Sequence, residues 1–181
     1  MENKHIKVGG GITKEITMGN DLPFTLIAGP CQLQNRDLAL KIAEYMKNLT
    51  EKLGINYVFK ASFDKANRNS VNGARGIGIE AGIKIFDEIR STFHIPVITD
   101  VHTEEQAGII APHVDMIQQP AFLIRQTDLS SAIAKTGKAC NLKKAQFMAP
   151  KDIKNTIAKN PFSRYYKCVV LLFTKLCYES P

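Results

Sequence analysis

Short apolar runs alternate with longer amphipathic stretches along most of this 181-residue chain. The runs are apolar throughout and rich in β-branched residues, which is typical of strands buried on both faces of a parallel sheet. Five such strands are predicted, at residues 24–28, 55–59, 96–99, 116–119 and 139–142. A predicted helix or helix start follows each strand, so the pattern indicates an α/β protein.

Turn and capping residues mark the ends of these elements. Residues 5–17 alternate around three glycines and predict an N-terminal β-hairpin. Asn35 is a favourable N-cap, and Thr103 opens a capping box with Gln106. Thr127-Asp128 is predicted to cap a helix over residues 129–135. The helix after Asn35 places one apolar row on one face, formed by Leu38, Ile42, Tyr45, Leu49 and Leu53.

Polar side chains gather where the predicted strands end. They are Cys31, Lys60, Ser62, Asp100, His102, Gln118, Lys143 and Gln146. In α/β folds the carboxyl edge of the sheet is where binding sites are built. Lys60 and Ser62 lie two apart and point to one face of a strand, with Lys65, Asn67 and Arg68 in the loop that follows. Such cations suit a small molecule that carries several negative charges.

A (β/α)8 barrel explains this pattern better than a dinucleotide-binding fold, because no G-x-G-x-x-G motif follows the first strand. A complete barrel needs eight units and about 250 residues, and this chain has five units. We therefore expect residues 1–159 to form the N-terminal part of a barrel, with the hairpin before it. Residues 160–181 break the pattern and are expected to be an atypical tail, disordered or frameshifted, in which 168–173 is a candidate sixth strand.

The net charge of +7 favours anionic partners. The basic residues are spread over successive strand ends and do not form a stripe with interleaved aromatics, which argues against nucleic acid. No apolar stretch reaches the roughly 18 residues of a membrane span, and the N-terminus lacks a signal-peptide pattern. The four cysteines form no C-x-x-C pair, so a reducing cytoplasm is expected.

Several single residues leave alternatives open. Cys31 can be a small buried hydrophobe or a metal ligand. Asp100 and His102 can act in acid–base or metal-linked chemistry, or can cap the next helix. Arg125 can meet an anion near a helix N-terminus or remain solvated. One side chain of the Lys143-Lys144 pair is expected to point into the cationic pocket.

Specific motifs make the chain resemble the 3-deoxy-D-manno-octulosonate 8-phosphate synthases between about Asp21 and Asn155. The matching stretches are residues 27–31, 59–68, 98–102, 120–122, 125–129, 134–137 and 143–147. The resemblance implies a (β/α)8 barrel and a transferase that condenses phosphoenolpyruvate with D-arabinose 5-phosphate and water, releasing phosphate. It also implies a cytoplasmic homotetramer that serves lipopolysaccharide synthesis. The related heptulosonate 7-phosphate synthases share the fold, and the run K-A-S-F-D-K-A-N-R favours the octulosonate enzymes.

The resemblance also assigns roles to individual residues. Those implied at the phosphoenolpyruvate site are Lys60, Ser62, Lys65, Gln118, Lys143 and Gln146. Asn67 and Arg68 would bind the pentose phosphate, with Arg125 reaching in from a neighbouring subunit. Lys60, Lys65, Asp100 and His102 are the implied catalytic residues. Cys31 matches the metal-ligand cysteine of the metal-dependent members, which implies a divalent metal as cofactor.

The chain departs from the pattern of these enzymes at three places. Asn69 stands where they have Ser or Thr, and Gln119 replaces an apolar residue. The resemblance ends near Asn155, before the strands that supply an Arg for the phosphate and the remaining His, Glu and Asp metal ligands. We therefore expect the chain to be a truncated, inactive form of the enzyme. The alternatives are a non-catalytic partial barrel that binds anions and a relative of the heptulosonate enzymes.

Overall fold

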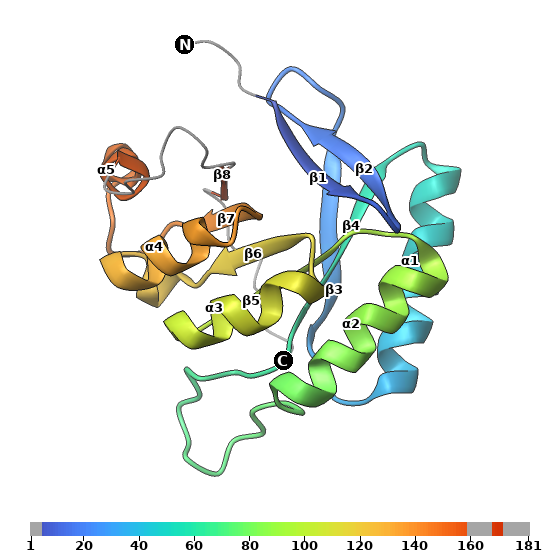
Figure 1. The fold of residues 1–181 in the computed structure, drawn as a ribbon, viewed down its shortest axis with the longest axis horizontal. Coiled ribbons are helices and arrows are strands. Elements are labelled where there is room, and N and C mark those ends of the chain that lie inside the picture. Colours follow the sequence, from blue (N-terminus) through green and yellow to red (C-terminus); the bar gives the residue numbers. More distant parts are fainter. Residues whose placement is uncertain (1–4, 159–167, 172–181) are drawn as a thin grey trace, which may run out of the picture.

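A computed structural model describes residues 5–158 together with 168–171, the latter by their backbone alone. Its centre is a six-stranded parallel sheet in which each strand pairs with the next one in sequence (Figure 1). The strands are β3 (Thr25–Gln32), β4 (Asn56–Ser62), β5 (Val97–Asp100), β6 (Met116–Gln119), β7 (Ala139–Lys143) and β8 (Cys168–Leu171). This sequential parallel order is that of a partial TIM barrel.

Helices connect the strands and cover one face of the sheet (Figure 1). They are α1 (Arg36–Lys52), α2 (Ile79–Phe93), α3 (Glu104–Ile110), α4 (Thr127–Lys135) and α5 (Ile153–Ala158), with short 3-10 turns at Ala111–His113, Ala121–Leu123 and Pro150–Asp152. The Asn35 side chain caps α1 by accepting a hydrogen bond from Leu38 N at 2.8 Å. Thr103 accepts one from Gln106 N at 3.3 Å at the start of α3, so both predicted caps are confirmed.

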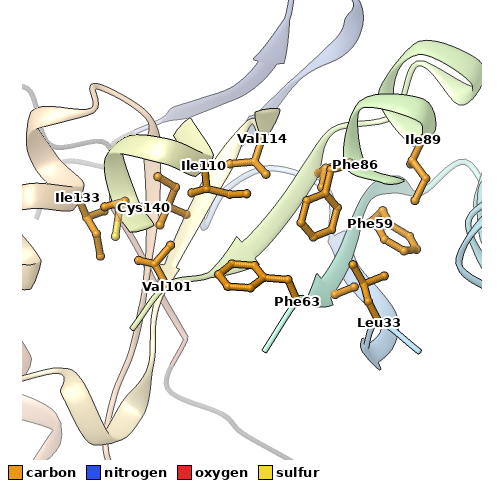
Figure 2. Close-up of a cluster of buried hydrophobic side chains, with 14 of the residues drawn as sticks. Leu33, Phe59, Phe63, Phe86, Ile89, Val101, Ile110, Val114, Ile133 and Cys140 are labelled. Carbon is orange, nitrogen blue, oxygen red and sulfur yellow. The ribbon is translucent and has the colours of Figure 1, made fainter. Parts of the chain in front are cut away.

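The main core lies between the helices and the sheet. Phe59, Phe63 and Phe86 are the largest of its fully buried side chains, and they pack between β4 and α2 (Figure 2). Every second residue of the central strands contributes to this core, because side chains alternate between the two faces of a strand. The intervening residues therefore point to the opposite face, where the polar strand-end residues gather.

The predicted N-terminal hairpin is confirmed, as β1 (Ile6–Gly10) and β2 (Thr13–Met18). Its Val8 and Ile16 form a second buried cluster with residues near the starts of the parallel strands, namely Val58, Ile98, Met116 and Ala139. The hairpin thus covers the N-terminal end of the sheet with apolar side chains. The opposite, C-terminal end carries the polar residues.

Of the apolar row predicted on α1, Ile42 packs against the core, but the other four side chains do not face it. Tyr45 and Leu53 are 67% and 61% exposed, and Leu38 and Leu49 are also exposed. The helix instead buries Ala39 and Ala43, together with Thr50. Leu40, Ile42 and Met46 pack against the core beside these alanines, so the buried face of α1 combines small and larger side chains.

Other boundaries also differ from the predictions. Strand β3 runs on through Cys31 to Gln32, with a register shift between Ala28 and Cys31. Helix α4 starts at Thr127 with Gln126 as its N-cap, and no side chain caps it, so the predicted Thr127-Asp128 cap is wrong. The candidate sixth strand is present as β8, over Cys168–Leu171. The rest of the predicted tail lies outside the described residues.

No helix in the described part of the chain is long and apolar enough to cross a membrane.

Candidate active site

The inner face of the sheet, opposite the helices, changes from apolar to polar along each strand. Val58 belongs to the apolar cluster under the hairpin, and Lys60 follows two residues later on β4. Ile98 on β5 is likewise followed by Asp100, and Met116 on β6 by Gln118. Side chains two residues apart on a strand share a face. Each of the three polar groups therefore lies next to the apolar side chain that precedes it, on the side of the carboxyl edge.

The register of the sheet aligns these polar residues across neighbouring strands. Asp100 pairs with Gln118, and Gln118 pairs with Asn141 on β7. The two amides are joined directly, with Asn141 Nδ2 donating to Gln118 Oε1 at 3.0 Å. Ser62 donates to Asp100 Oδ1 and so extends the row to β4. A continuous row of buried polar side chains therefore crosses strands β4 to β7.

Asp100 is the centre of a chain of hydrogen bonds. Lys65 Nζ donates to Ser62 Oγ at 2.7 Å, and Ser62 donates onward to Asp100 Oδ1. His102 Nε2 lies 3.3 Å from the other carboxylate oxygen, Oδ2. The ring of His102 also packs edge-on against Phe63, with 6.2 Å between ring centroids. The four predicted residues Ser62, Lys65, Asp100 and His102 are thus brought together.

Burial and neighbouring charges shape the ionisation of this cluster. Burial lowers the pKa of Lys60, and the positive charges of Lys65 and Lys143 lower it further, against the opposing effect of Asp100. For Asp100, burial alone would raise the pKa, but the hydrogen bond with His102, the charge of Lys60 and the hydrogen bond from Ser62 lower it to about 2. The carboxylate is therefore ionised at neutral pH, and the ammonium of Lys60 is held in an unfavourable, cation-rich setting.

The two lysines at the end of β7 diverge, as predicted. Lys143 is half-buried and contributes to the field at Lys60. Lys144 turns back to the chain, and its Nζ donates to Ala145 O at 2.7 Å and Met148 O at 2.9 Å. Of this pair, Lys143 is therefore the lysine whose charge acts on Lys60.

The loop between β4 and α2 carries Arg68 to the rim of the site. Arg75 pairs with Asp64 in this loop, with 2.8 Å between Nε and Oδ1, and Lys65 N donates to Arg75 O at 2.6 Å. Arg68 Nε donates to Ala74 O at 2.8 Å, and its Nη2 donates to Gln32 Oε1. Gln32 lies at the end of β3, beside Ser62 in the register. The exposed guanidinium of Arg68 therefore lies at the carboxyl edge of the sheet.

Three predicted residues are not joined to this cluster. Asn67, Arg125 and Gln146 are exposed, and no hydrogen bond or ion pair in the described part of the chain connects them to it. Arg125 instead lines a separate cavity of about 660 Å³, which it shares with Thr127 and Phe147 among others. Asn69 is exposed in the loop.

Cys31 stands at the carboxyl end of β3 with a left-handed backbone, at φ +59°. Its side chain is exposed, and it is close enough to Lys60 to influence its pKa. Within residues 5–158, however, no group of three or more His, Cys, Asp and Glu side chains could hold a metal ion. The described residues therefore do not fit a complete metal site, and Cys31 supplies a single candidate ligand.

Sequence reasoning missed Asn141. Its side chain is fully buried in the polar row, while its Oδ1 has no hydrogen-bond partner among the described residues. The signal was present, because Asn141 stands two residues before Lys143 in an otherwise apolar strand. His102 Nδ1 is the second buried atom near the site that lacks a partner in the described part.

Fold and cluster together define an α/β protein of the TIM-barrel type, with a cation-rich site at the carboxyl ends of its strands. A sequence model of the DAHP synthetase I family matches residues 4–168, and the chain belongs to that family.

Curated relatives carry a more specific name. The chain is 51% identical over 157 residues to the 2-dehydro-3-deoxyphosphooctonate aldolase of Brucella canis, an alignment that covers 87% of this chain and 55% of that protein. It is 56% identical over 146 residues to the protein of the same name from Rickettsia bellii, covering 81% of this chain and 53% of the relative. The chain therefore spans about half the length of the curated relatives it matches.

Proposed function

We propose that this chain provides the phosphoenolpyruvate-binding part of a 3-deoxy-D-manno-octulosonate 8-phosphate synthase. The observation that carries the proposal is the surplus of positive charge around Lys60. The charges of Lys65 and Lys143 both act on Lys60, and the ionised Asp100 is the acidic group that opposes them. An anion with two charged groups would relieve this repulsion, and phosphoenolpyruvate carries both a carboxylate and a phosphate.

Each residue of the cluster then has a role that follows from its position. The ammonium groups of Lys60, Lys65 and Lys143 hold the anionic groups of phosphoenolpyruvate, and Gln118 offers an amide donor beside them. Asp100 fixes Ser62 and His102 by accepting on both oxygens. His102 is then placed to hold or release a proton beside the reacting carbons.

The second substrate is proposed to enter from the rim. Arg68, with Asn67, would bind the phosphate of D-arabinose 5-phosphate, and Arg125 would act across a subunit boundary in a homotetramer. Gln146 would complete the phosphoenolpyruvate site. Bringing two phosphorylated molecules together requires fixed cations that offset their repulsion. Water then supplies an oxygen atom, phosphate leaves, and the eight-carbon acid phosphate forms as a precursor of lipopolysaccharide.

A divalent metal remains a proposal that rests on Cys31. Its thiolate would be one ligand, and the metal would orient the sugar aldehyde and the water. Since the described residues offer no group of three ligands, no step proposed for this chain depends on the metal.

Two measurements test the proposed function. Calorimetric titration with phosphoenolpyruvate should show binding, and Lys65→Met should weaken it at least tenfold because a contacting cation is lost. Lys84→Met is the matched control, since Lys84 is an exposed lysine on α2 and should leave affinity unchanged. Phosphate release with both substrates, with and without divalent metal, then tests turnover. Failure of the wild-type chain to bind phosphoenolpyruvate would overturn the proposal.

Binding without turnover is the second candidate function. It is favoured by the sheet itself, because β3 and β8 are the outer strands of the described sheet and do not pair with each other. Unpaired parallel edges promote association, so this candidate predicts a dimer or larger species by light scattering. Phosphate release at the rate of the related enzymes would exclude it.

A further inference from the structure

We propose that Asn141 is a positioning residue that sets the orientation of the Gln118 amide, so that Gln118 presents Nε2 to the bound anion. The inference rests on the proposed function, because it concerns how the same site holds phosphoenolpyruvate. It adds a residue that the motifs of similar enzymes did not single out.

The first argument is geometric. Asn141 and Gln118 are direct neighbours in the register of β6 and β7, and Asn141 Nδ2 donates to Gln118 Oε1 at 3.0 Å. The oxygen and nitrogen of a carboxamide lie on opposite sides of its axis. When Oε1 is turned toward β7, Nε2 is therefore turned away from Asn141, and no hydrogen bond within the described residues occupies it.

The second argument concerns what an anion requires. A glutamine amide has nearly the same shape in its two orientations, but one offers a donor and the other an acceptor. An acceptor facing a carboxylate or phosphate would repel it. Asp100 is the other register neighbour of Gln118, but no hydrogen bond joins the two side chains among the described residues, whereas Asp100 accepts from Ser62 and lies 3.3 Å from His102. Among the described residues, Asn141 is the group that hydrogen-bonds the Gln118 amide.

The third argument is energetic. Asn141 is 0% exposed, and its Oδ1 has no partner among the described residues. A buried carbonyl oxygen without a hydrogen bond costs about 1–3 kcal/mol, which offsets part of what the bond from Asn141 to Gln118 contributes to folding. An unfavourable polar group beside a binding site indicates a role in that site.

A double-mutant cycle tests the inference, with phosphoenolpyruvate as the probe and calorimetry as the readout. Asn141→Leu should weaken binding about five- to tenfold, and Gln118→Leu should weaken it at least as much. In the Gln118→Leu background, Asn141→Leu should have no further effect, because its influence passes through Gln118. Equal losses in both backgrounds, or wild-type affinity in Asn141→Leu, would overturn the inference.

Thr99→Val is the matched control. Thr99 is also fully buried with an unpartnered hydroxyl in the described part, but it pairs in register with Ile117, a residue of the helix-facing core. The substitution removes a buried polar group from the same sheet without touching the site, so the affinity for phosphoenolpyruvate should not change.

A ligand-free measurement separates this inference from the proposed function. In the nitrogen-15 spectrum of the wild-type chain, the Gln118 side-chain amide should give two sharp, well-separated proton signals. In Asn141→Leu these signals should move and broaden, because the amide can turn. If the wild-type chain does not bind phosphoenolpyruvate, the proposed function fails, and this spectrum alone decides the inference. Unchanged Gln118 signals in Asn141→Leu would refute it.

Discussion

The carboxylate of Asp100 lies 3.3 Å from Nε2 of His102, and its other oxygen accepts a hydrogen bond from Ser62. One acidic side chain thus links the ends of two strands and the segment that leads into α3. Because both partners favour the charged form, Asp100 is ionised despite its burial. Stability and anion binding should therefore both depend on this residue.

Asp100 should make folding stability sensitive to acid. Its pKa in the folded protein is lowered from 3.8 to about 2, so the folded state favours the ionised form. This contribution, about 2 kcal/mol, is fully present above pH 4 and is lost as the pH falls from about 4 to about 2. Urea unfolding of the wild-type chain across this range should show the loss, and Asp100→Asn should show a flatter pH dependence.

Asp128→Asn is the control for this prediction, since Asp128 is an exposed carboxylate on α4. The substitution removes the same charge without touching the cluster. If Asp100→Asn keeps the wild-type pH dependence, the hydrogen bonds to Asp100 do not stabilise the fold.

Lys60 should couple anion binding to proton uptake as the pH rises through its lowered pKa. Burial and the neighbouring lysines lower its pKa, and a bound anion would raise it again. Between these two pKa values the free amine is neutral and the complex is protonated, so phosphoenolpyruvate binding takes up a proton and weakens as the pH rises. Calorimetry in two buffers with different ionisation enthalpies measures this uptake. It should disappear in Lys60→Met and persist in Lys84→Met, and its absence from the wild-type chain would contradict the prediction.

How much of the structure can be predicted from the sequence depends on how regularly side chains alternate along each element. On strands a period of two residues fixes the face, so the meeting of Lys60, Ser62, Asp100 and His102 followed from their spacing. Gln119, which the resemblance gave as a replacement of an apolar residue, is fully buried. Its Nε2 donates to Leu123 O at 2.8 Å, and its Oε1 accepts from Ser130 at 3.0 Å.

The face of a helix depends on what packs against it, which the sequence of the helix does not contain. Helix α1 has two candidate faces, and the structure buries the one with Ala39 and Ala43. Asn141 was missed for a different reason, because one asparagine within a buried strand forms no pattern. Only its place in the register beside Gln118 reveals its contact.

Substitutions on α1 test which face is buried. Ala43 is 0% exposed, so Ala43→Leu should overpack the core and lower the free energy of unfolding by about 1–3 kcal/mol. Leu49 is 37% exposed, and Leu49→Lys should change stability by less than about 0.5 kcal/mol. Chemical denaturation of the two variants measures both values. If Leu49→Lys lowered the free energy of unfolding more than Ala43→Leu does, the predicted apolar row would be the buried face after all.

Gly29 should be irreplaceable, because β3 passes close to the backbone of β4 at this residue. A Cβ atom at this position would lie 2.0 Å from the carbonyl oxygen of Lys60, a separation that real structures do not allow. Gly29→Ala must therefore push the strands apart, which should cost at least about 1–3 kcal/mol of stability and displace Lys60 from the site. Phosphoenolpyruvate affinity should fall together with stability.

The control is Gly108→Ala in α3, where an added Cβ meets nothing within 4 Å. Alanine favours the helix by up to about 1 kcal/mol over glycine, so this variant should be slightly more stable and should bind phosphoenolpyruvate as the wild-type chain does. Thermal unfolding and calorimetric titration of both variants provide the comparison. Wild-type stability in Gly29→Ala would mean that β3 and β4 are further apart at this point than the structure shows.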